Sequence, residues 1–109
     1  MAKVHDVTIW IDGAGIAKAT NVPLAKPGDN VNWINTTTAK AIVFFPHGGV
    51  FGSGSGHFHH QIKDGDSFKP ARAVVRQSTR KRTCRYAIWC EETHAFAIGN
   101  SDPEIIVET

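Results

Sequence analysis

The chain has 109 residues, of which 41% are hydrophobic and 20% are charged, and its formal net charge is +2 at pH 7. A chain of this length and composition is expected to fold as one globular domain, residues 1–109, with its own core. No apolar run approaches the roughly 20 residues of a membrane-spanning helix, so no membrane span is predicted. No apolar export signal follows Met1, and the sequence by itself leaves the cellular compartment unknown.

Short segments of alternating apolar and polar residues, separated by turn-forming residues, predict strands along the whole chain. The main expected strands are Val4–Ile11, Asn30–Asn35, Ala41–Phe45, Ser67–Arg76, Arg82–Cys90 and Glu104–Val107. A polar stretch over 77–81 is expected to join two of them, 67–76 and 82–90, as an antiparallel hairpin. No segment shows the 3.6-residue period of an amphipathic helix. About seven to eight strands therefore indicate an all-β protein, either a β-sandwich or a small barrel.

Cys90 and His94 are the first candidate functional residues. Cys90 ends an expected strand, and His94 lies on the loop three residues beyond Glu91. A thiolate with nearby imidazoles suits copper or zinc, whereas a buried cysteine that only packs as a small hydrophobe is the alternative. Cys84 lies six residues before Cys90 in an extended segment, about 20 Å away, which is too far for a disulfide.

Three further histidines, His57, His59 and His60, follow a glycine-rich stretch. In the expected hairpin, the chain after this cluster enters the sheet at the same end as Cys90, so these side chains could reach toward the sulfur. A solvated loop is the alternative reading. The basic turn at 80–82 has no interleaved aromatic residues, which argues against nucleic acid as a partner. No nucleophile–base or paired-carboxylate arrangement is present at a useful spacing, so the sequence predicts no enzyme.

Motifs in a fixed order along nearly the whole chain resemble the cupredoxins of the plastocyanin and azurin type. They are the turn AKPGD, the strand NVNWIN, the A-x-V-x-F strand from Ala41, the turn GDSF, the run Y-x-I-x-C-x-x-x-H that ends at His94, and a closing I-I-V strand. The resemblance implies a Greek-key β-sandwich that holds type-1 copper near one end, with two histidines, a cysteine and usually a methionine as ligands. It also implies a periplasmic or extracytoplasmic location and a redox or copper-handling protein partner.

Carried onto this sequence, the family pattern places Cys90 at the thiolate position and His94 at the second histidine position. The first histidine position holds Ala41, and Ala95–Asn100, where the methionine belongs, contains none. Two hypotheses follow. The first is an atypical metal centre, with copper as the cofactor, built from Cys90, His94 and a histidine of the 57–60 cluster, which serves electron transfer or copper handling. The second is a metal-free cupredoxin-fold module with a binding or structural role.

Overall fold

Short strands make up the regular structure of the chain. The computed structural model describes residues 3–20, 22–46, 51, 58–70, 73–74, 82–97 and 104–107. Eleven strands are formed within these ranges: β1 (Val4–Ile11), β2 (Ala17–Ala19), β3 (Val22–Ala25), β4 (Asn30–Asn35), β5 (Ala41–Phe45), β6 (Phe58–Ile62), β7 (Ser67–Phe68), β8 (Arg82–Arg85), β9 (Ala87–Cys90), β10 (Ala95–Phe96) and β11 (Glu104–Val107). The described part of the chain holds no helix long and apolar enough to cross a bilayer.

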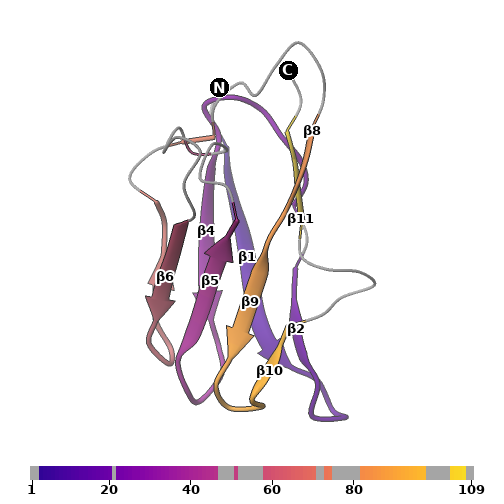
Figure 1. Ribbon diagram of the computed structural model, residues 1–109. Coiled ribbons are helices and arrows are strands. Elements are labelled where there is room, and N and C mark those ends of the chain that lie inside the picture. Colours follow the sequence, from indigo (N-terminus) through magenta and orange to yellow (C-terminus); the bar gives the residue numbers. More distant parts are fainter. Residues whose placement is uncertain are drawn as a thin grey trace.

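Two four-stranded sheets form the two layers of a β-sandwich (Figure 1). One has the strand order β2-β1-β4-β7, and the other has the order β10-β9-β5-β6. A third sheet, β3-β11-β8, extends the sandwich. In the first layer, β1 runs parallel to β4. In the second layer, β5 is antiparallel to both of its neighbours, β6 and β9. The predicted all-β sandwich is confirmed.

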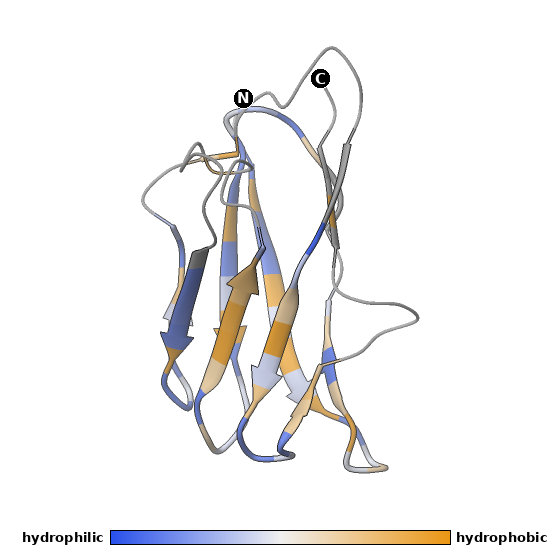
Figure 2. Ribbon diagram, viewed as in Figure 1, coloured by the Kyte–Doolittle hydropathy of each residue, from blue (hydrophilic) through white to orange (hydrophobic). Residues whose placement is uncertain are grey.

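The core follows from strict alternation along the strands that face each other. In β4, Val31 and Trp33 are buried while their neighbours are half-buried, and in β5 Ala41, Val43 and Phe45 are buried. Successive side chains of a strand point to opposite faces, so one face of each layer packs against the other layer. The apolar residues of β5 and β9 are visible in Figure 2, where these strands contrast with the hydrophilic β6.

The structure corrects two of the expected strands and the hairpin that was expected to join them. Of the segment expected as one strand over 67–76, the described residues form a strand only at Ser67–Phe68, which pairs with β4 and not with Arg82–Cys90. The Arg82–Cys90 segment is divided at Tyr86 into β8 and β9, because β8 pairs with β11 and β9 pairs with β5 and β10. The remainder of the expected hairpin, 71–72 and 75–81, lies outside the described residues.

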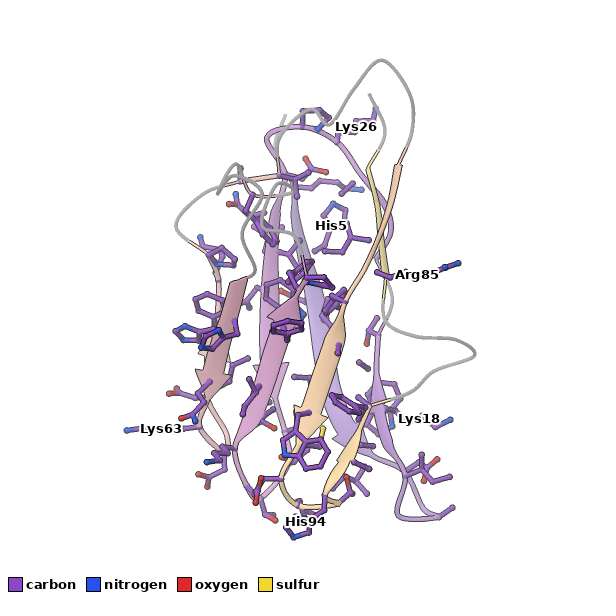
Figure 3. All side chains as sticks on the ribbon, viewed as in Figure 1. His5, Lys18, Lys26, Lys63, Arg85 and His94 are labelled. Atoms are coloured by element: carbon purple, nitrogen blue, oxygen red, sulfur yellow. The ribbon has the colours of Figure 1, made fainter. Side chains whose placement is uncertain are left out.

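Asp29 stabilises one end of the sandwich through hydrogen bonds. Figure 3 shows its partner His5 toward the end of the sandwich that lies opposite His94. Its carboxylate accepts hydrogen bonds from the Lys3 N–H at 3.0 Å, the Lys26 N–H at 3.0 Å and His5 Nε2 at 2.8 Å. Burial of Asp29 acts to raise its pKa, but these hydrogen bonds outweigh the burial and lower the pKa from 3.8 to about 2. The ionised carboxylate therefore connects β1 to the turn between β3 and β4.

Acidification should consequently destabilise the fold through Asp29. Because the folded-state pKa lies below the unfolded value, the stabilisation is fully present above about pH 4 and is lost as the pH falls toward about 2. A shift of this size corresponds to about 2 kcal/mol of unfolding free energy. Urea titrations between these pH values should show the loss in the parent and not in Asp29→Asn. Asp6→Asn, which removes an exposed carboxylate, should keep the parental pH dependence of the unfolding free energy. If both variants lost this pH dependence to the same extent, its assignment to Asp29 would be contradicted.

Candidate metal centre

Cys90 lies at the end of β9 on the face that points into the core, and its side chain is fully buried. Its neighbour on β5 is Ala41, the first residue of that strand, which is also fully buried, and its neighbour on β10 is Ala95. Burial is the larger cause that raises the pKa of the Cys90 thiol to about 11, and the negative charge of Glu92 adds to it. In this environment the sulfur is a protonated thiol at neutral pH. Cys90 is also free of any disulfide, as the sequence predicted.

The loop after Cys90 is bound to the loop that precedes β5. The Glu91 N–H donates to the Lys40 carbonyl at 3.1 Å. The Glu92 carboxylate accepts two hydrogen bonds from Thr38, from its N–H at 2.6 Å and from its hydroxyl at 2.5 Å. Both hydrogen bonds lower the pKa of Glu92, and the bond from the Thr38 hydroxyl has the larger effect. The loop position is therefore set by residues 54 positions away in the sequence.

His94 ends this loop and points toward solvent (Figure 3). Its backbone has a positive φ of 51°, and 76% of its side chain is exposed. The ring Nδ1 lies 3.7 Å from Glu91 Oε1, while Glu91 Oε2 accepts a hydrogen bond from Trp89 Nε1 at 3.0 Å. Trp89 belongs to the outer face of β9, and Cys90 belongs to the inner face. The imidazole is thus held on the solvent side of the loop, whereas the thiol faces the core.

The histidines of the 57–60 cluster are distributed along β6, except for His57, which lies outside the described residues. In the β5–β6 register, Ile62 stands opposite Ala41, His60 opposite Val43 and His59 opposite Phe44. His60 is therefore two strands and two residues from Cys90, roughly 12 Å between Cα atoms. The described residues contain no group of three His, Cys, Asp or Glu side chains placed to hold a metal ion.

His60 instead closes the open edge of the sandwich. Its ring stacks on Phe68 of β7, in the opposite layer, with 3.7 Å between ring centroids and 9° between planes. Phe68 in turn stacks on the buried Trp33 at 6.1 Å, and Trp33 Nε1 donates a hydrogen bond to the Tyr86 hydroxyl at 3.1 Å. The sequence did not predict β6 or the packing of His60 on Phe68, because its histidines were interpreted as part of a loop or as metal ligands.

Asn35 was also missed as a structural residue of this end of the sandwich. It is fully buried, and its side-chain amide donates to the carbonyls of Ala39, Ile62 and Lys63 at 2.9, 3.1 and 3.2 Å. Its oxygen accepts from the N–H and the hydroxyl of Thr37 at 3.0 and 2.7 Å. The available signal was the alternation of β4, which places this polar side chain on the core face. Asn35 holds the loop that leads into Ala41.

These residues do not match a type-1 copper site in the described geometry. Such a site requires two imidazoles and a thiolate in a trigonal arrangement. Here an alanine methyl group stands beside Cys90, the sulfur is in a setting that favours the thiol, and His94 is paired with Glu91. Among the expected residues that the structure describes, only Cys90 and the backbone of the His94 loop come together.

Comparison with solved structures identifies the fold. An amicyanin with a methionine-to-alanine substitution, in its Cu(I) form, matches over 98% of this chain and 82% of its own, with a TM-score of 0.56 and 21% identity. A reduced amicyanin with a tryptophan-to-tyrosine substitution matches over the same shares, with a TM-score of 0.55 and 20% identity. The chain has a cupredoxin-like fold. No family model and no curated protein matches the sequence, so the fold is the extent of this likeness.

Proposed function

We propose that this chain is a binding or structural module built on a cupredoxin-like fold, without a preformed type-1 copper centre. The register of β5 and β9 carries the proposal, because it pairs Cys90 with Ala41. Directly paired residues have Cβ atoms about 4.5–5.5 Å apart, so a methyl group occupies the space beside the sulfur where the family pattern has an imidazole. The buried thiol and the outward position of His94 support the same conclusion.

Copper handling or electron transfer is the second candidate. It is favoured by the placement of Cys90 at a strand end, directly before a loop that carries His94. A thiolate and an imidazole suit copper, and His57 or His60 would have to supply a further ligand, because His59 is paired with Phe44 on the outer face of the sheet. For this centre to form, His94 would leave Glu91 and turn to the core side of the loop, and the thiol would lose its proton. The partner would then be a redox or copper-handling protein.

Copper titration separates the two candidates. Copper(II) and copper(I) are added to the purified protein, excess metal is removed, and the visible spectrum and retained metal are measured for the parent, Cys90→Ser and His94→Ala. For a metal-free module we expect no thiolate-to-copper band and no retained copper in any of the three. A band in the parent that is absent from Cys90→Ser would establish the second candidate instead. Copper retained equally by Cys90→Ser would place binding on the histidines.

A further inference from the structure

The outer face of the β10-β9-β5-β6 sheet carries a continuous apolar strip. In the strand register, Phe96, Trp89 and Ile42 form one row, and Ala87 and Phe44 form the next row on the same face. These five residues are defined here as the aromatic strip. Phe96 is 57% exposed and Phe44 is 39% exposed, and the other three are half-buried. Phe96 packs edge-on against Trp89, with ring centroids 5.2 Å apart.

Two groups of complementary character lie at opposite corners of the aromatic strip. At the His94 end, Glu91 receives the hydrogen bond of Trp89, which is the main cause of its lowered pKa. At the other corner, the exposed His59 stands opposite Phe44 on the edge strand β6. The two corners are two strands and four residues apart, roughly 17 Å. Ile42 lies midway between them.

We propose that the aromatic strip binds the same strip of a second copy of this chain. The two copies would be related by a two-fold axis that lies in the plane of the interface and passes over Ile42. The axis is perpendicular to the line from Glu91 to His59. With this axis the face is complementary to itself. It sets the Glu91 carboxylate of each copy against the His59 imidazole of the other, which can donate a hydrogen bond to it. An isologous contact requires this kind of reciprocal match.

The same axis also matches the shapes of the apolar side chains. Phe44 of each copy lies over Trp89 of the other, and the prominent Phe96 lies over the small Ala87. Aromatic pairs across an interface add to the burial of their area. The strands of the two copies cross steeply, as in orthogonally packed sheets. The inference concerns the outer face, whereas Cys90 lies on the inner face. Because Glu91 is also the partner of His94, the dimer is tested on protein kept metal-free by a chelator.

Sedimentation velocity on metal-free protein tests the interface. Because the strip is small, we expect a monomer–dimer equilibrium with a dissociation constant on the order of micromolar. Phe44→Glu should weaken dimerisation at least tenfold. The matched control is Trp10→Glu, which changes an aromatic residue that is 37% exposed on the opposite layer and should leave the dimer intact. A parent that is monomeric throughout, or equal losses in both variants, would overturn the proposal.

A charge exchange tests the predicted orientation. Glu91→Lys and His59→Glu should each weaken the dimer, whereas the double variant restores opposite charges across the interface and should recover most of the affinity. Failure of the double variant to recover, with its fold intact by circular dichroism, would overturn the orientation. Because chelator is present throughout, the result is separate from the copper titration, and either can fail without the other.

Discussion

Replacing Asn35 by alanine is expected to lower the free energy of unfolding by about 3 kcal/mol. The fully buried Asn35 side chain makes five hydrogen bonds, three to carbonyl groups and two from Thr37. Alanine removes all five, and the loss falls mainly on the two buried contacts, those with the Ile62 carbonyl and the Thr37 N–H. A buried group that loses its partner costs about 1–3 kcal/mol when water cannot reach it. The carbonyls of Ala39 and Lys63 keep other donors, the Thr37 hydroxyl and the Asp66 N–H. Partial access of water to the loop keeps the total below the sum of these costs.

Thermal and urea unfolding should show this loss as a drop in melting temperature of roughly 12–24 °C. The matched control is Asn32→Ala on the same strand, where the side chain makes an exposed hydrogen bond to Asp6 at 3.3 Å. The control should change the unfolding free energy by less than about 0.5 kcal/mol. Similar losses in both variants would mean that the effect comes from the strand position and not from the buried hydrogen bonds.

The sequence predicts the strands whose alternation is strong. Val4–Ile11, Asn30–Asn35, Ala41–Phe45 and Glu104–Val107 were all predicted with the bounds that the structure has. The pairing of β7 with β4 was not predicted, because alternation identifies a strand and its inner face but not its neighbour in the sheet. The expected hairpin joins two segments that are adjacent in the sequence. The structure instead pairs strands that are distant in the sequence, such as β7 with β4 and β8 with β11.

The candidate site shows the same limit at the level of single side chains. Cys90 was correctly placed at a strand end, since that follows from local pattern. The direction of His94 depends on its positive φ, on Glu91, and on a loop anchored by Thr38, which is distant in sequence. The role of His60 likewise depends on Phe68 in the opposite layer. The spacing of residues within one segment does not predict contacts with residues that are distant in the sequence.

Replacing Ala41 by histidine is expected to create copper binding at Cys90. Ala41 and Cys90 are directly paired and both face the core, so the new imidazole would lie beside the sulfur. A bound metal stabilises the thiolate and so offsets the high pKa of the buried thiol. With copper(II) added, the variant should retain about one equivalent and show an intense thiolate-to-copper band, whereas the parent shows neither. Without metal, the larger side chain should cost about 1–3 kcal/mol of stability.

Val43→His is the control that isolates the position. Val43 is on the same strand, faces the same core and is equally buried, but its partner across the sheet is Ile88 and not Cys90. It should carry a similar or larger stability cost and show no thiolate band. Adding Cys90→Ser to Ala41→His should abolish the band as well. A folded Ala41→His variant without copper, or an equal band in Val43→His, would contradict the placement of Cys90 at a latent ligand position. The expected pattern would show that Cys90 stands at a ligand position whose neighbouring imidazole is replaced by the methyl group of Ala41.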